Sequence, residues 1–227
     1  MATMYDKLLQ LSLFQGLTLN ELTKILEKVT FLFENYKAGD VIINEGGPCK
    51  RVAFLLDGEI QKKTVVKGDH PLEVKEWIAA PFTFELSSLF GRQTTYRSTY
   101  IASADSNIMW MHKRFLMEEL NIYPIIDMNY RNLISAQVQT LNDYLWGAPA
   151  SSEKGHFARF LLQHLEQPQG QKVFYVQRAD LAAFLNESFF KTSQLLIQMQ
   201  REGLLTYERG RLILPDAALL KDLAYPI

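Results

Sequence analysis

The chain has 227 residues, of which 48% are hydrophobic, and its formal net charge is −1. This length suffices for two domains of ordinary size, and the apolar content supports packed cores. The sequence contains no run of about 18 apolar residues and no basic, apolar leader, so we expect neither a membrane span nor a signal peptide. The single cysteine, Cys49, cannot form an intramolecular disulfide, which suits a reducing cytoplasm.

Two helices are expected at the start of the chain. Met4–Leu13 has helical spacing, and Leu17–Val29 is amphipathic, with Thr18 or Asn20 as its expected N-cap. The apolar stripe of the second helix consists of Leu19, Leu22, Ile25, Leu26 and Val29. This spacing predicts that the helix packs against a core.

The region from Thr30 to Met111 has the pattern of antiparallel β-structure. Short runs of β-branched and aromatic residues alternate with turn signals such as Asp57-Gly58 and Gly68-Asp69. Short strands at this regular spacing predict an antiparallel β-barrel or jelly roll. Pro81–Gly91 departs from the pattern, because it indicates the end of a strand followed by one helical turn. Such a turn either contacts a ligand or only plugs one end of the barrel.

A long helix is expected from Pro124 to about Trp146, since proline suits the first turn of a helix. Its apolar residues form two adjacent faces, one of them with the 4-3-4 spacing of a coiled-coil seam. One face can pack on the chain's own barrel and the other on a partner's helix, so we expect a homodimer. The alternative is that a single chain covers both faces. The expected interface residues are Ile126, Tyr130, Leu133, Ile134, Val138, Leu141 and Leu145.

The C-terminal third has the layout of a winged helix-turn-helix. A linker, Gly147–Ser152, precedes an expected helix over Glu153–Leu165 and a strand over Lys172–Val176. Arg178–Leu205 then reads as two helices joined at Asn186–Ser188, with Ser188 as N-cap of the second helix and Gly203 near its end. A hairpin with its turn at Arg209-Gly210 follows, and it would form the wing. Modules of this kind lay their second helix in the DNA major groove.

Four further strings resemble the CRP/FNR family of bacterial transcription regulators. They are LFQGLTLNELTKIL, YKAGDVIINEG, FLLDGEIQ and ADSNIMWMHKRFL, in the family's order and ahead of the winged helix. The resemblance covers essentially the whole chain. It implies an α+β protein with a cyclic-nucleotide-binding-like sensor domain (1–120), a dimerisation helix (121–147) and a winged helix-turn-helix DNA-binding domain (148–227). It also implies a dimeric, DNA-binding transcription regulator. We expect no enzyme, because the sequence shows no nucleophile–base pair and no glycine loop that would cradle a phosphate.

In that family, a Gly-Glu-Leu sequence and a following Arg bind a cyclic nucleotide. Here Phe84-Glu85-Leu86 lacks the glycine, and the position of the Arg falls on Thr94 or Thr95, so we expect an effector other than cyclic AMP. An aromatic or apolar effector is one alternative, and a barrel filled by its own aromatic residues is the other. The candidate effector residues are Trp77, Phe82, Phe84, Glu85, Leu86, Thr94, Thr95, Tyr96 and Arg97.

The expected recognition helix also departs from the family, because Phe189, Phe190 and Gln194 stand where arginine and glutamate are common. Glutamine can read adenine, and phenylalanine can contact a thymine methyl group. The candidate DNA-binding residues are Ser188, Phe189, Phe190, Lys191, Thr192, Gln194, Gln198, Arg209 and Arg211. The expected partners are double-stranded DNA and a second copy of the chain, with a small-molecule effector and RNA polymerase as further candidates.

Two other classes of protein remain to be weighed. A ligand-binding or protein-interaction module with weakened or lost DNA binding would differ by lacking salt-dependent binding to duplex DNA. A metal-dependent or iron–sulfur protein is not indicated, because there is one cysteine and the four histidines are scattered. We therefore expect neither a metal nor a cofactor.

Overall fold

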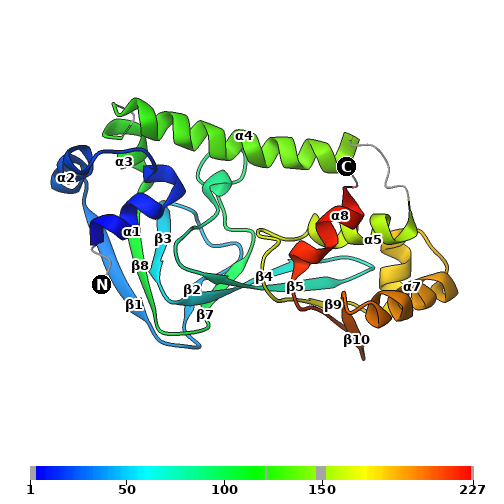
Figure 1. Cartoon of the computed structure of the whole chain (residues 1–227). Helices are drawn as coiled ribbons and strands as arrows, with labels where there is room; N and C mark the ends of the chain where they lie inside the picture. Colours follow the sequence, from blue (N-terminus) through cyan, green and yellow to red (C-terminus); the bar gives the residue numbers. More distant parts are fainter. Residues whose placement is uncertain (1–3, 121, 147–151, 226–227) are drawn as a thin grey trace. The chain divides into compact units, whose positions relative to one another are not determined.

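The computed structural model describes residues 4–120, 122–146 and 152–225 (Figure 1). The chain forms two compact units. The first unit consists of Met1–Gln61 and Ile78–Thr140, and the second consists of Lys62–Trp77 and Leu141–Ile227. Among the described residues, no helix has both the length and the apolarity needed to cross a membrane.

The first unit begins with helices α1 (Met4–Gln10) and α2 (Leu19–Lys28), joined through a 3-10 turn at Ser12–Phe14. Thr18 caps α2, because its hydroxyl accepts the backbone N–H of Glu21 while the Glu21 carboxylate accepts the N–H of Thr18. The predicted second helix and its Thr18 cap are therefore confirmed. The first predicted helix ends earlier, at Gln10.

The strands of the first unit form antiparallel, jelly-roll-like sheets. One sheet has the order β1 (Phe31–Tyr36), β8 (Ser106–His112), β3 (Arg51–Asp57) and β6 (Phe82–Thr83). In the other sheet, β2 (Val41–Ile43) pairs with β7 (Thr99–Ala102), and β4 (Glu59–Val66) lies next to β7. The predicted fold class is confirmed, although the described strands do not close into a barrel. Phe14, Phe54, Phe84 and Tyr100 are among the largest fully buried side chains of this core.

Two further helices follow β8. They are the short α3 (Lys113–Glu118) and the 23-residue α4 (Pro124–Trp146). The bounds of α4 agree with the sequence prediction. Ile126 is buried in the core of the first unit, and Tyr130, Leu133 and Ile134 pack against that core.

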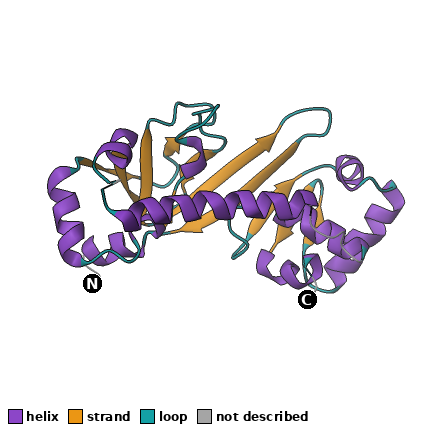
Figure 2. Cartoon of the chain, turned by 90° about the horizontal axis from the view of Figure 1, so that it is seen from above, coloured by secondary structure: helices purple, strands orange, loops and turns teal. Residues whose placement is uncertain are grey.

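The second unit contains the predicted helix-turn-helix and wing (Figure 2). Its elements are α5 (Glu153–Leu162), β9 (Lys172–Tyr175), α6 (Arg178–Leu185), α7 (Phe189–Arg201), β10 (Thr206–Glu208), β11 (Arg211–Leu214), a 3-10 turn (Ala217–Leu220) and α8 (Lys221–Ala224). Helix α5 ends at Leu162 rather than at Leu165. The linker predicted at Gly147–Ser152 lies outside the described residues except for Ser152, whose hydroxyl caps α5.

The turns of this unit have local causes. Asn186 ends α6 in the left-handed conformation (φ 53°), and Ser188 caps α7 by accepting the backbone N–H of Lys191. Arg209 and Gly210 both have positive φ, of 50° and 79°, as the tight hairpin between β10 and β11 requires. Both predicted turns are confirmed.

The sequence pattern does not indicate that a strand from the N-terminal half of the chain pairs with a strand of the second unit. Strand β5 (Leu72–Ala79) forms an antiparallel pair with β9, with Glu73 opposite Tyr175 and Glu76 opposite Lys172. Leu72 and Val74 are buried in the same core as Phe157 and Phe174. The outer part of the β4–β5 hairpin is thus an integral part of the second unit.

Candidate nucleic-acid interface and sensor site

The N-terminal half of α7 presents an apolar surface. The side chains of Phe189 and Phe190 are 56% and 68% exposed, and Ile197 is 54% exposed further along the helix. The opposite face of α7 carries Leu195, Leu196 and Met199, which are buried and hold the helix on its unit. Burial of one face leaves the other free for a partner.

The polar candidates on α7 separate into two groups. Ser188, Lys191, Gln194 and Gln198 are exposed. Thr192 is only 1% exposed, so its side chain lies inside the unit and the structure does not bring it to the surface with the others. Helical spacing accounts for this difference, because Thr192 lies one turn before Leu196 and Leu195 on the buried face.

Arg178 is a residue of this surface that the sequence interpretation missed. Its guanidinium carbon lies 5.5 Å from the ring centroid of Phe189 and 5.3 Å from that of Tyr207. The cation therefore connects α6, the start of α7 and the wing. The only local signal for Arg178 in the sequence was a positively charged residue at the first position of α6.

Lys191 forms ion pairs with two carboxylates, which compete with any contact to a DNA phosphate. Its Nζ lies 3.3 Å from a carboxylate oxygen of Glu187 and 3.5 Å from one of Glu153. The hydrogen bond with Glu187, followed by the charges of both carboxylates, raises the pKa of Lys191. Lys191 is already paired with these two carboxylates. The exposed Arg201, Arg209 and Arg211 are therefore better candidates than Lys191 for contact with phosphates.

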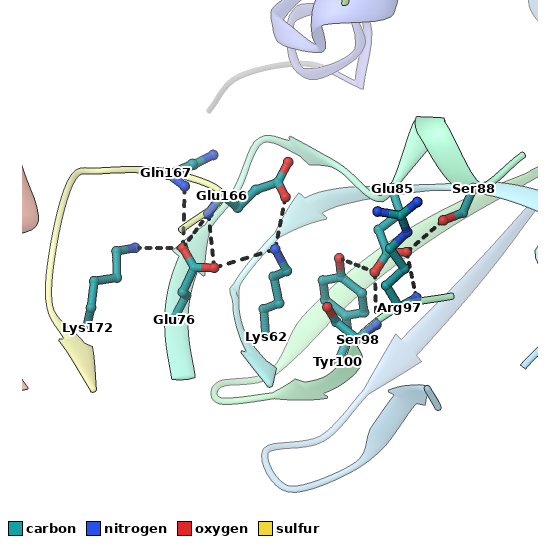
Figure 3. Close-up of polar contacts among 10 residues, drawn as sticks. All are labelled: Lys62, Glu76, Glu85, Ser88, Arg97, Ser98, Tyr100, Glu166, Gln167 and Lys172. Atoms are coloured by element: carbon teal, nitrogen blue, oxygen red, sulfur yellow. Dashed lines mark hydrogen bonds and ion pairs between the residues drawn. The ribbon is translucent and has the colours of Figure 1, made fainter. Parts of the chain in front are cut away.

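In the first unit, the carboxylate of Glu85 is buried and fully hydrogen-bonded (Figure 3). It accepts hydrogen bonds from the Ser88 hydroxyl (2.9 Å), the Arg97 N–H (2.9 Å), the Ser98 N–H (3.1 Å) and the Tyr100 hydroxyl (3.1 Å). A carboxylate offers about four acceptor positions, so these four donors saturate it. In this arrangement Glu85 orders its own loop.

The other candidate effector residues are only partly brought together. Phe82, Phe84 and Tyr100 form a chain of edge-on rings, with centroid distances of 5.3 Å and 4.9 Å. The Tyr96 hydroxyl donates to the carbonyl of Arg51 (3.1 Å), and burial is the main cause that raises its pKa. Like Phe82 and Phe84, Leu86 and Tyr96 are buried, whereas Thr94 is half-buried and Thr95 and Arg97 are exposed. Trp77 belongs to the second unit.

Within the described ranges, no three His, Cys, Asp or Glu side chains gather closely enough to hold a metal ion. Cys49 is a buried free thiol, and burial raises its pKa. Its raised pKa disfavours the reactive thiolate.

The C-terminal half of α4 presents the second exposed apolar surface. Val138, Leu141 and Leu145 are 50%, 56% and 74% exposed, and Trp146 is 84% exposed. The first three share one side of the helix at 3- and 4-residue spacing. Of the remaining residues expected at a dimer interface, Ile126 is buried in the chain's own core, and Tyr130, Leu133 and Ile134 are partly buried against it.

Comparison with known proteins agrees with this architecture. Residues 155–223 match the model of the Crp-like helix-turn-helix domain. The catabolite activator protein of Thermus thermophilus is 19% identical, with 94% of this chain and 98% of that chain covered and a TM-score of 0.51. A CooA mutant from Carboxydothermus hydrogenoformans is 18% identical over 95% and 100% of the two chains, with a TM-score of 0.49. A search of curated protein sequences finds no match.

The second unit thus contains a Crp-like helix-turn-helix domain, and the chain is similar in fold to the catabolite activator protein over 94% of its length. The resemblance to the CRP/FNR family is confirmed for the fold and for this domain. A DNA-binding transcription regulator is the class of protein that these features support.

Proposed function

We propose that the chain is a homodimeric transcription regulator that reads duplex DNA with α7 and responds to an effector other than cyclic AMP. The observation that carries the proposal is the match of residues 155–223 to the Crp-like helix-turn-helix domain. The exposed face of α7 is the part of that domain available to a major groove.

The side chains on α7 define the kind of DNA read. Phe189, Phe190 and Ile197 offer apolar contact to thymine methyl groups, and Gln194 can bond adenine through N6 and N7. The first two turns carry no arginine for bidentate contact with guanine, and Lys191 is paired with two carboxylates. We therefore propose A·T-rich half-sites, with Ser188 and Gln198 in supporting contacts and Arg209 and Arg211 on phosphates.

The proposed dimer rests on α4. Val138, Leu141 and Leu145 form an apolar stripe with the spacing of a coiled-coil seam, and all three are at least half exposed. A second copy of the same helix would cover this stripe with an identical one, as a twofold interface requires. Two winged helices related by a twofold axis read a palindrome.

The proposed effector differs from cyclic AMP because Glu85 is saturated by protein donors. A ribose hydroxyl would have to displace the hydroxyl of Ser88 or Tyr100 or a backbone N–H of residues 97–98. The buried rings of Phe82, Phe84 and Tyr96 favour an aromatic or apolar molecule, which would displace only packing contacts.

Selection from a library of random duplex DNA by the ligand-free protein tests this function. Enrichment of an A·T-rich palindrome is the expected result. If a folded, dimeric protein enriches nothing, the selection is repeated with candidate small molecules, and continued failure rejects sequence-specific DNA binding.

The second candidate function is a protein-interaction module with weakened DNA binding. The pair of exposed phenylalanines on α7 favours it, because aromatic side chains are enriched in protein–protein interfaces. Salt-dependent binding to random duplex DNA separates the two functions, since only the regulator releases counterions from phosphates.

A further inference from the structure

A small pocket opens in the second unit beside the start of α7. Its walls come from the first turn of α5 (153–156), from the end of α6 with the turn after it (185–187), and from the first half of α7 (191–195). The volume of the pocket is about 180 Å³. Because a water molecule occupies about 30 Å³ in the liquid, the pocket has room for roughly six waters or for a ligand of similar size.

The buried end of the pocket carries an unpartnered hydroxyl group. Thr192 is 1% exposed, and within the part of the chain that the structure describes its Oγ1 atom has no hydrogen-bond partner. The carbonyl of Ser188, a common partner for a threonine hydroxyl in a helix, accepts the backbone N–H of Thr192. A buried hydroxyl without a partner is costly, so this group is available to a molecule inside the pocket.

The exposed end of the pocket carries the charges. The side chains of Glu153 and Glu187 are 61% and 33% exposed, and the Lys191 Nζ lies 3.5 Å and 3.3 Å from their carboxylate oxygens. The one ammonium group of Lys191 balances only one of these two carboxylates. With His156 counted as uncharged at pH 7, the lining therefore keeps an excess of one negative charge, which favours a cation.

The pocket also has apolar walls. Leu185 at the end of α6 and Leu195 on α7 both line it, and Leu195 is 7% exposed. Apolar walls with a few polar groups that fix orientation are typical of small-molecule sites. The complementary ligand has an ammonium group at one end, a short aliphatic chain, and a hydroxyl group at the other end.

We propose that this pocket binds a short amino alcohol, whose ammonium group displaces that of Lys191 from Glu153 and Glu187 and whose hydroxyl group bonds Thr192. A hydroxyl both donates and accepts, so it satisfies the Thr192 Oγ1 in either direction. The Lys191 side chain, 54% exposed, then turns to solvent or to another anion. The inference concerns ligand binding by the second unit and stands whether or not α7 reads DNA.

Titration of the full-length protein with 4-amino-1-butanol, followed by the NMR signals of the backbone amides, tests the proposal. Saturable shifts are expected for residues 153–156 and 185–195. Two matched probes separate the contacts, because pentylamine has a methyl group in place of the hydroxyl and 1,4-butanediol has a hydroxyl in place of the ammonium. Pentylamine is expected to bind about fivefold more weakly, and the diol at least about tenfold more weakly.

Thr192→Val removes the protein hydroxyl at nearly constant shape. Because this hydroxyl has no partner in the chain, the variant is expected to fold at least as well as the wild type. Its affinity for 4-amino-1-butanol should fall about fivefold, and its affinity for pentylamine should not fall, since only the first probe loses a hydrogen bond.

Lys191→Met tests the displacement. This variant lacks the ammonium group that competes with the ligand, so both amines are expected to bind about threefold or more tightly. Glu153→Gln removes one carboxylate and should weaken both amines about fivefold. Glu208→Gln is the matched control, because it makes the same chemical change at an exposed position on β10 outside the pocket, and it should keep the wild-type affinities.

Three results would overturn the proposal. The first is the absence of saturable shifts at these amides with up to about 50 mM 4-amino-1-butanol, because a ligand of this size with these contacts is expected to reach millimolar affinity. The second is an equal effect of Thr192→Val on the binding of 4-amino-1-butanol and of pentylamine. The third is unchanged or weaker binding of the amines to Lys191→Met.

Discussion

At the scale of single residues, Glu85 illustrates how surroundings decide the role of a carboxylate. The residue type fits recognition of a ribose hydroxyl, but four protein donors already occupy its oxygens. Each lost hydrogen bond to a charged group costs about 1.5–3 kcal/mol, so a ligand must replace the bonds that it breaks. This supports the proposal of an effector that leaves Glu85 in place.

His164 makes the stability of the second unit depend on pH. Its ring packs on Phe160 at a centroid distance of 4.8 Å, and burial lowers the pKa of His164. The unfolded chain therefore takes up a proton at a higher pH than the folded chain. The stabilising effect of the neutral ring is complete above the ordinary histidine pKa of about 6.5, and it is lost as pH falls from there toward the lowered folded value.

We expect the free energy of unfolding of the wild type to decrease between pH 7.5 and pH 5.5 more steeply than that of His164→Gln. Urea denaturation at several pH values measures both slopes. His156→Gln, at an exposed position on the same helix, serves as control and should keep the wild-type slope. Equal slopes for His164→Gln and the wild type would contradict the assignment.

At the scale of elements, α7 carries the prediction about DNA specificity. Phe190→Ala removes the most exposed apolar side chain of this helix, at 68% exposure. Loss of a base-pair contact typically costs about 1–3 kcal/mol, so binding to the selected operator should weaken roughly tenfold. Binding to random duplex should not change, because phosphate contacts do not involve this residue.

Fluorescence anisotropy with the operator and with random duplex measures both affinities. Leu219→Ala is the control, since Leu219 is 53% exposed and lies in the 3-10 turn rather than on α7. Equal weakening on both duplexes would indicate that Phe190 supports the fold of the domain and does not read bases.

Some elements of the fold could be predicted from the sequence, and others could not. The positions of α2, α4, α6 and α7 follow from caps and apolar spacing within a few residues, so each was predicted. The pairing of β5 with β9 joins residues about a hundred positions apart, and no local pattern encodes such a partner. For the same reason, the burial of Glu76 beside Lys62 and Lys172 was not visible in the sequence. The burial of Thr192, in contrast, agrees with helical spacing, because Thr192 lies one turn before Leu195 and Leu196.

At the scale of the whole molecule, the near-neutral charge limits how DNA can be recognised. The chain carries 24 Lys and Arg against 25 Asp and Glu, so it has little general attraction to phosphate. Affinity must then come from a few local contacts, and doubling these contacts in a dimer is the most effective way to raise it. The apolar stripe on α4 (Val138, Leu141 and Leu145) is therefore the surface on which the proposed dimer, and with it the affinity for DNA, depends.

Leu141→Glu combined with Leu145→Glu places two charges on this stripe, and like charges on two facing copies repel each other. The double variant is expected to be monomeric by light scattering. Its affinity for the palindrome is expected to fall at least about tenfold, because two linked copies of α7 no longer bind the two half-sites together. Ala136→Glu with Thr140→Glu is the matched control, since both positions are exposed on the opposite side of α4. A double variant that stays dimeric would place the interface elsewhere. A monomer with unchanged affinity would instead show that α7 reads DNA without a twofold partner.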